Sequence, residues 1–155
     1  FWPLTCGMRL VLAGPDDHRD PAALVQLIRE QQVNVIQFVP ALLQQFLEVE
    51  EVGECSSLTD VFCGGGELTA ALVRSVRERL PQVRLHNVYG PTEATVVATS
   101  GRIEAGDALH IGKPVTNATV LCDGQPVPNA FIWIKNRPYV FIKITGLTHT
   151  VQISW

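Results

Sequence analysis

The chain has 155 residues, of which 46% are hydrophobic and 17% charged, and its formal net charge at pH 7 is −3. This length fits one domain with a substantial apolar core, and the slight acidic excess argues against nucleic acid as a partner. No apolar run is long enough to span a membrane and the first ten residues do not resemble a signal peptide, so we expect a cytoplasmic protein without membrane contact.

The four cysteines are far apart in the sequence and show neither C-x-x-C nor C-x-x-H spacing. This spacing is more typical of buried free thiols than of a metal site or a disulfide framework. We therefore expect buried, unpaired thiols at all four positions, which are Cys6, Cys55, Cys63 and Cys122.

Short apolar runs alternate with amphipathic helical patterns from residue 9 onward. Residues 9–14 form an apolar run that ends in Gly-Pro, which predicts a buried strand. Asp20 followed by Pro21 predicts the N-cap and first position of a helix, because proline lacks the amide hydrogen that this position does not need. Strand followed by helix is therefore the first unit of the chain.

The same pattern repeats twice more and ends in a fourth strand. Residues 33–39 predict a strand followed by a helix that Pro40 opens, and residues 58–64 predict a strand followed by a helix that Thr69 caps. Residues 83–89 predict the last strand of this series. Continuously hydrophobic strands alternating with helices indicate an α/β fold, with a mostly parallel sheet flanked by helices that cover both faces.

After Tyr89 the pattern becomes β-rich, without a further helix. Residues 94–103 predict a strand, residues 108–115 a loop, and residues 118–127 a strand with an Asp-Gly turn.

The last acidic residue is Asp123, and this break in composition predicts a domain boundary between residues 129 and 130. The composition favours a tail (130–155) that arose from a shifted reading frame, a disrupted gene or a wrongly assigned end. A genuine β-hairpin with Pro138 at an edge is the alternative.

Two loops follow the carboxyl ends of predicted parallel strands, where ligands collect in open α/β sheets. The first, "CGGGEL", contains three glycines whose backbone could lie against a flat ring or a phosphate, although a tight turn before a helix would need glycine too. The second, "YGPTE", offers an aromatic face at Tyr89, a hydroxyl at Thr92 and a hard oxygen ligand for Mg²⁺ at Glu93. Alternatively, Glu93 is a solvated acid and Tyr89 a core aromatic.

The stretch "NVYGPTEAT" (87–95) resembles the core-five motif of the adenylation domains of nonribosomal peptide synthetases, within the adenylate-forming superfamily. The stretches "VIQFVPALLQQFL", "LTDVFCGGGEL" and "HIGKPVTNATVLCDGQPVPN" resemble neighbouring family elements, and the likeness covers residues 1 to about 129. It implies a partial adenylation-domain core at 1–129 and a non-homologous tail at 130–155.

The resemblance implies attack of an amino-acid carboxylate on the α-phosphate of ATP, giving an aminoacyl adenylate and pyrophosphate. Carried over by position, Glu93 would bind Mg²⁺ and Thr92 would contact phosphate. Asn87 and Tyr89, in the same motif as Gly90, would frame the adenine. Gly65, Gly66 and Glu67 would form the opposite wall of the nucleotide site.

Six positions match the family's specificity code, namely Gln37, Phe62, Gly64, Val88, Val96 and Val97. One amide among apolar walls favours a medium-sized substrate side chain with a polar end, such as that of glutamine. An aliphatic substrate, with Gln37 hydrogen-bonded internally, remains the alternative.

The family's phosphate loop and its C-terminal catalytic lysine have no counterpart in the printed sequence, so we expect negligible activity in isolation. In the parent family the activated amino acid passes to the phosphopantetheine thiol of a peptidyl carrier domain that works with a condensation domain. The alternatives are a non-catalytic remnant or interaction module, and an acyl-coenzyme A synthetase-like enzyme of the same superfamily.

Overall fold

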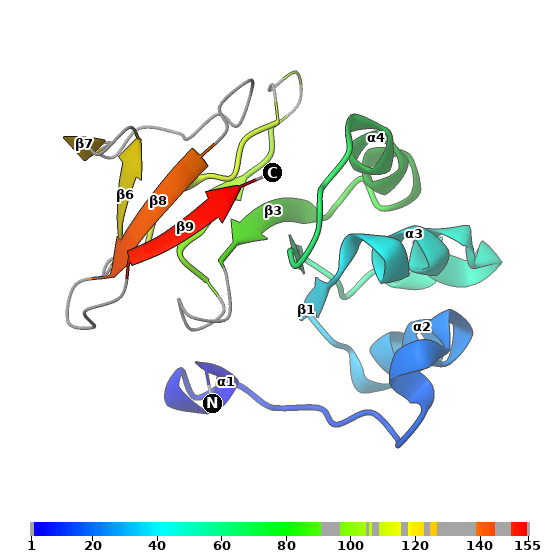
Figure 1. Cartoon of the computed structure of the whole chain (residues 1–155). Coiled ribbons are helices and arrows are strands. Elements are labelled where there is room, and N and C mark those ends of the chain that lie inside the picture. Colours follow the sequence, from blue (N-terminus) through cyan, green and yellow to red (C-terminus); the bar gives the residue numbers. More distant parts are fainter. Residues whose placement is uncertain are drawn as a thin grey trace.

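The computed structural model describes residues 2–90, 97–104, 106, 109–115, 118–122, 125–126, 139–144 and 150–154. Three helices form one stacked layer in Figure 1: α2 (Pro21–Gln31), α3 (Pro40–Glu48) and α4 (Ala70–Arg79). Shorter helical segments are α1 (Trp2–Thr5), η1 (Asp17–Arg19) and η2 (Glu50–Glu54).

The first sheet has five strands in the order β1-β2-β3-β4-β5. Strands β1 (Val35–Phe38), β2 (Asp60–Cys63) and β3 (Arg84–Tyr89) are parallel to one another. Strands β4 (Thr99–Arg102) and β5 (Lys113–Pro114) add antiparallel pairs at the far edge. The predicted α/β class is therefore confirmed. The predicted loop at 108–115 is wrong at its end, because β5 pairs there with β4.

A second, antiparallel sheet has the order β7-β6-β8-β9. It contains β6 (Ala118–Cys122), β7 (Gln125–Pro126), β8 (Tyr139–Ile144) and β9 (Thr150–Ser154). Strands β8 and β9 pair from Tyr139 with Ser154 to Lys143 with Thr150. The origin of the tail and the domain boundary before residue 130 stay predictions.

The helix starts lie where local sequence signals predict them. The Asp20 carboxylate accepts hydrogen bonds from the backbone amides of Ala22 and Ala23, and the Thr69 hydroxyl accepts one from Leu72. These caps satisfy amide groups that have no partner inside the helix. Pro40 occupies the first turn of α3, so all three predicted helix starts are confirmed.

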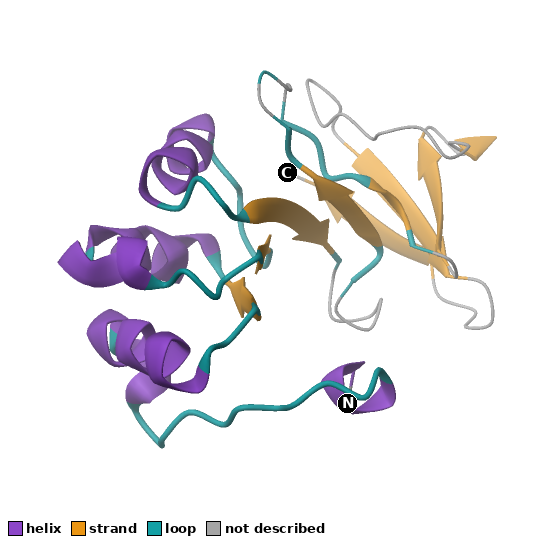
Figure 2. Ribbon diagram, turned by 180° about the vertical axis from the view of Figure 1, so that it is seen from behind, coloured by secondary structure: helices purple, strands orange, loops and turns teal. Residues whose placement is uncertain are grey.

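The three helices cover only one face of the parallel strands, as Figures 1 and 2 show from opposite sides. The prediction that helices cover both faces is therefore wrong. Its physical reason is the strand order: β1, β2 and β3 follow one another across the sheet, so successive right-handed crossovers place α3 and α4 on the same side. We call the opposite side the helix-free face; its residues are Val35, Gln37, Asp60, Phe62, Gly64, Arg84, His86 and Val88.

The hydrophobic core lies between the helix layer and the sheet. Phe46 and Leu43 of α3, Ile28 of α2 and Val61 of β2 are at most 1% exposed. The rings of Phe46 and Phe38 pack with their centroids 4.9 Å apart. These apolar contacts hold the helix layer on the sheet.

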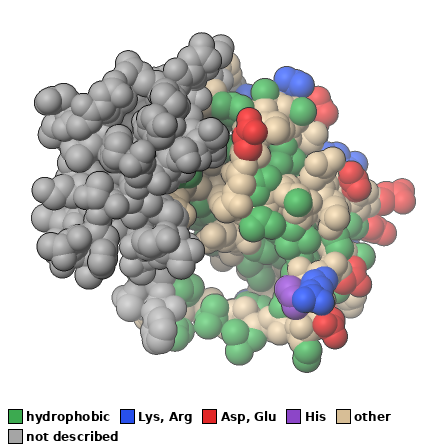
Figure 3. Space-filling view, viewed as in Figure 1, with side chains coloured by type: hydrophobic (Ala, Val, Ile, Leu, Met, Phe, Trp, Pro, Cys, Tyr) green, Lys and Arg blue, Asp and Glu red, His purple; other side chains and the backbone are tan. Residues whose placement is uncertain are grey.

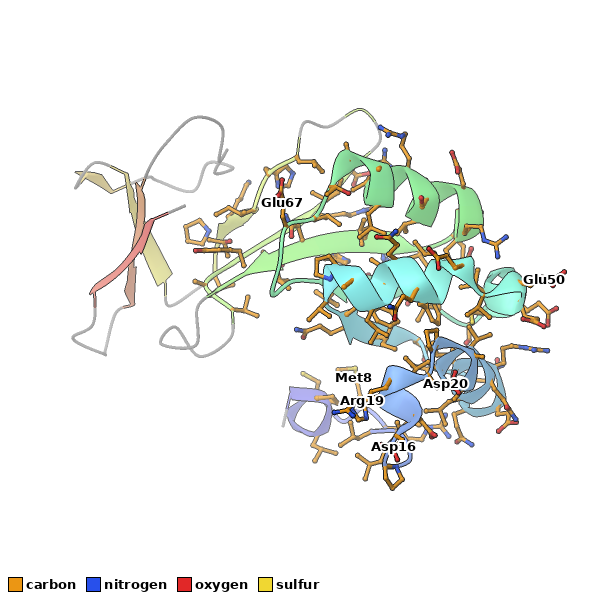
Figure 4. The ribbon with its side chains drawn as sticks, turned by 45° about the vertical axis from the view of Figure 1, so that its right-hand side comes forward. Met8, Asp16, Arg19, Asp20, Glu50 and Glu67 are labelled. Atoms are coloured by element: carbon orange, nitrogen blue, oxygen red, sulfur yellow. The ribbon has the colours of Figure 1, made fainter. Side chains whose placement is uncertain are left out.

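The predicted strand at residues 9–14 is absent, because no described strand pairs with this segment. Leu12 is 79% exposed, and Met8, which Figure 4 shows near α1, is 39% exposed. The expectation of four buried thiols is also wrong at Cys6, which is exposed, whereas Cys55 and Cys63 are buried. Within the described residues, no helix has the length and apolar character needed to cross a membrane.

Candidate functional site

The triple-glycine loop begins at the carboxyl end of β2 and packs against β3. The backbone amide of Gly64 donates a hydrogen bond to the carbonyl of Phe38. A Cβ atom at Gly64 would lie 2.5 Å from the carbonyl oxygen of Val88, and Gly65 has a left-handed φ of +79°. Glycine is therefore required at these two positions by packing and backbone conformation, apart from any role toward a ligand.

The residues predicted to bind nucleotide lie around the carboxyl ends of β2 and β3. Glu67 is exposed in the connection to α4, and Figure 4 shows it at the opposite end of the helix layer from Glu50. Tyr89 ends β3 and is half-buried, and this burial raises the pKa of its phenol. Gly90 follows directly and is partly exposed, and Gly66 packs against Pro40. Thr92, Glu93 and Val96 lie outside the described residues.

Asn87 has a defined internal role on the helix-covered side of β3. Its side-chain nitrogen donates a 2.8 Å hydrogen bond to the carbonyl of His110, and the residue is only 8% exposed. The neighbouring Thr99 hydroxyl donates to the carbonyl of Ile111 at 2.7 Å. These two bonds fasten residues 110–111 to β3 and β4, whereas contact of Asn87 with adenine stays a prediction.

Four of the six predicted substrate-pocket residues share the helix-free face. Gln37 and Phe62 are register partners on β1 and β2, and Gly64 lies against Val88. The Gln37 side chain is exposed and makes no hydrogen bond to another described residue. Val97 precedes Ala98, whose amide donates a hydrogen bond to the carbonyl of Tyr89 at the end of β3. The structure therefore brings residues from three separate strands, as far apart in the chain as Gln37 and Val88, onto one face.

The sequence analysis missed an ion-pair cluster on the same face. The Asp60 carboxylate accepts hydrogen bonds from Arg84 at 2.8 and 2.5 Å, and its Oδ1 lies 2.8 Å from Nε2 of His86. The hydrogen bonds from Arg84 hold the pKa of Asp60 well below its usual range, against the opposing effect of partial burial. The signal in the sequence was weak: Asp60 and Arg84 each begin a parallel strand, and only the register pairs them.

The imidazole of His86 also contacts the predicted pocket. Its ring stacks on that of Phe62, with centroids 4.5 Å apart and planes inclined by 14°. The structure places it between a carboxylate and an aromatic ring, with its side chain 19% exposed.

The surface elsewhere carries a groove of about 680 Å³ between α2 and η2. It is bordered by Gln26 and Glu51 and by the ion pair of Arg29 with Glu54, whose atoms are 2.6 Å apart. None of the predicted site residues that the structure describes lines it. In Figure 3, hydrophobic side chains occupy the middle of the described surface and charged ones gather toward its rim. Within the described part of the chain, no three His, Cys, Asp or Glu side chains gather as a metal site would need.

Comparison with known proteins identifies the family of this chain. Residues 1–135 match the model of the AMP-binding enzymes. The chain is 45% identical over 145 residues to phosphinothricin tripeptide synthetase PhsB of Streptomyces viridochromogenes, covering 89% of this chain but 12% of the synthetase.

Two solved structures agree with this match. One is a four-domain nonribosomal peptide synthetase bound to AMP and glycine, with a TM-score of 0.72 and 28% identity over 94% of this chain and 11% of that one. The other, a nonribosomal peptide synthetase protein with adenylation and PCP domains, has a TM-score of 0.65 and 25% identity over 82% of this chain and 26% of that one.

The chain belongs to the AMP-binding enzyme family. It is related to the adenylation domains of nonribosomal peptide synthetases and spans a small part of each relative.

Proposed function

We propose that this chain supplies part of an ATP and amino-acid site for adenylation in nonribosomal peptide synthesis. In that reaction an oxygen of the amino-acid carboxylate attacks the α-phosphorus of ATP. The bond between the α- and β-phosphates breaks, pyrophosphate leaves, and an aminoacyl adenylate forms. The activated acyl group then passes to a carrier-domain thiol. The reaction belongs to the whole domain, of which the chain is a part.

The observation that carries the proposal is the gathering of Gln37, Phe62, Gly64 and Val88 on one face, beside the glycine loop. In parallel sheets, ligands bind beyond the carboxyl ends of the strands, and β2 and β3 both end at this loop and at Tyr89. The structure of a relative bound to AMP and glycine supports a site that takes both a nucleotide and an amino acid.

The predicted nucleotide-site residues each have a proposed role. Tyr89 is partly buried and keeps a neutral phenol, which suits it to lie against an adenine ring beside Asn87. The backbone at Gly65 and Gly66 leaves room for the opposite side of the nucleotide, with Glu67 exposed at the loop. Glu93 supplies the carboxylate oxygen for Mg²⁺, next to Thr92 at the phosphates. The metal, when bound, neutralises phosphate charge.

The residues of the helix-free face also indicate which kind of substrate side chain the proposed site would accept. Gln37 offers an amide that is not used inside the described part of the chain, on the same face as the apolar side chains of Phe62 and Val88. An unused amide next to apolar walls favours a medium-sized side chain with a hydrogen-bonding end, such as that of glutamine.

Binding of Mg·ATP to the 155-residue chain tests the nucleotide assignment. We expect weak, magnesium-dependent binding by titration calorimetry or ligand-detected NMR, weakened at least tenfold by Glu93→Gln because the metal loses a charged ligand. Glu78→Gln, an exposed change on α4, is the matched control and should leave the affinity unchanged. Equal affinity of the Glu93→Gln variant and the wild type would contradict the assignment.

Pyrophosphate exchange separates this proposal from that of a non-catalytic remnant. We expect no exchange above background from the chain by itself with any amino acid, together with measurable Mg·ATP binding. Exchange by the isolated chain would rule out the remnant, whereas absence of both exchange and binding would favour it.

A further inference from the structure

Val39 directly follows β1 and is an exposed apolar residue at the carboxyl end of that strand. Its backbone stays extended, with φ −83° and ψ 151°, so the alternation of side chains along the strand continues to this residue. Phe38 points toward the helices and is 2% exposed, whereas Val39 is 50% exposed. Val39 therefore extends the helix-free face, on the same side of β1 as Val35 and Gln37.

Val39 lies against the glycine loop. A Cβ atom built on Gly65 would lie 3.4 Å from Cγ1 of Val39, which is van der Waals contact. A Cβ atom built on Gly66 would lie 3.3 Å from the ring of Pro40, the next residue of the chain. The end of β1 and the start of α3 therefore touch the loop that we assign to the nucleotide.

The strand register adds Val39 to the residues of the predicted pocket. Phe38 pairs with Cys63, so the next step of these parallel strands brings Val39 opposite Gly64. On the other side of Gly64, a Cβ atom would meet a methyl group of Val88 at 2.5 Å. This row thus has an exposed valine at one end, a glycine in the middle and a valine that is 7% exposed at the other end.

The position of Val39 along its strand decides what its side chain can contact. Val39 and Gln37 are two residues apart on one face, which is about 6.6 Å along the strand, and neighbouring strands lie about 4.8 Å apart. A frame of this size is comparable with one amino-acid side chain. Ligands of parallel sheets bind at the carboxyl ends of the strands, where Val39 lies. Val35 has the same side chain and the same face, but lies at the amino end.

We propose that Val39 is a further specificity-determining residue of the amino-acid pocket: its isopropyl group forms a wall next to the glycine loop and limits the size of the substrate side chain. The inference rests on the function proposed above. Val39 is not among the six positions that match the family's specificity code. Gln37 then offers hydrogen bonds to the polar end of the substrate, and Val39 sets the size limit.

Methyl NMR of the 155-residue chain with ¹³C-labelled valine tests the contact directly. A saturating concentration of L-glutamine should shift the methyl signals of Val39 and leave those of Val35 unchanged. The signals are assigned by their loss in Val39→Thr and Val35→Ala. The two valines are both exposed and share one face of one strand, so the comparison isolates the position along the strand.

Substitutions of Val39 test the size limit through the ratio of affinities for L-phenylalanine and L-glutamine, measured by saturation-transfer NMR. Val39→Ala shortens the wall to a single methyl group and should change the ratio about tenfold toward phenylalanine. Val39→Ile lengthens the wall and should change the ratio toward glutamine, which keeps the size limit measurable if the alanine variant fails to fold. Val39→Thr preserves the volume, and Val35→Ala is the matched control, so both should stay within about twofold of the wild type.

The outcomes separate this inference from the proposed function. If glutamine binds without a shift at Val39, or if the ratio is the same in the wild type and the alanine and isoleucine variants, the inference is overturned and the proposed function stays intact. If the wild-type chain binds neither amino acid at millimolar concentration, the proposed amino-acid site is contradicted in this chain and the inference falls with it. A shift at Val39 but not Val35, with ratios that follow the side-chain volume at position 39, supports the inference.

Discussion

The two faces of the parallel strands differ in both chemistry and burial. Toward the helices, Phe38, Val61, Cys63 and Leu85 are at most 4% exposed and pack against apolar helix side chains. Toward the helix-free side, Val35 is 37% exposed and the strands carry an ion-pair cluster and an aromatic stack. The helix-covered face therefore stabilises the fold, and the helix-free face presents side chains of the proposed site.

The largest loss of stability should come from a substitution in the core below the helix-covered face. Phe46→Ala removes a ring that is fully buried against Phe38, and we expect a loss of about 3–5 kcal/mol in the free energy of unfolding, measured by urea denaturation. Gln45→Ala, an exposed change on the same helix, should stay within about 0.5 kcal/mol of the wild type. Similar losses for the two variants would contradict the described core.

The next largest loss of stability should come from the glycine loop on the helix-free face. Gly64→Ala would place a methyl group 2.5 Å from the backbone oxygen of Val88, and we expect it to cost about 1–3 kcal/mol of stability. Gly53→Ala is the matched control, because its Cβ would meet nothing closer than 3.8 Å. This control should be neutral or slightly stabilising. Tolerance of alanine at position 64 would mean that the glycine loop does not pack on β3 as described.

A smaller effect concerns the ion pair of the helix-free face. Asp60→Asn should cost about 1–2 kcal/mol near pH 7, because the charged hydrogen bonds with Arg84 are lost. The pKa of Asp60 is lowered in the folded state, so as the pH falls the unfolded chain takes up this proton first.

The contribution of the Asp60 charge to the free energy of unfolding is therefore complete above about pH 5 and declines below about pH 4. Urea denaturation of both proteins between pH 3 and 7 checks this: the difference between the wild type and Asp60→Asn should shrink in acid. A difference that stays constant would show that the charge of Asp60 does not act in the folded protein.

The last prediction compares the reactivity of two thiols and requires no change in the stability of the protein. Burial raises the pKa of Cys63 to about 11, which leaves almost no thiolate at pH 8, whereas Cys6 is exposed. We expect iodoacetamide to modify Cys6 at least tenfold faster than Cys63, as followed by peptide mass spectrometry. Unfolding the chain in urea should remove the difference between the two modification rates. Equal rates in native buffer would indicate that the helix-covered face opens readily.

Local signals in the sequence determined the helices and the order of the elements. Asp20, Pro40 and Thr69 marked the helix starts because capping and proline geometry depend only on neighbours in the chain. The parallel strands were predicted for the same reason, from uninterrupted apolar runs. The run at residues 9–14 carries the same signal but is no strand, because a strand needs a partner and no described strand pairs with it.

The tertiary structure decided which side chains meet. The sequence by itself determined the family motif, the alternation of strands and helices and the glycines of the loop, all of which are properties of short stretches. Its pattern predicted helices on both faces, which is wrong, and it gave no sign that Asp60, Arg84 and His86 form a cluster beside Phe62. Strand register depends on packing between segments some twenty-five residues apart, and a single strand carries no record of its neighbours' register.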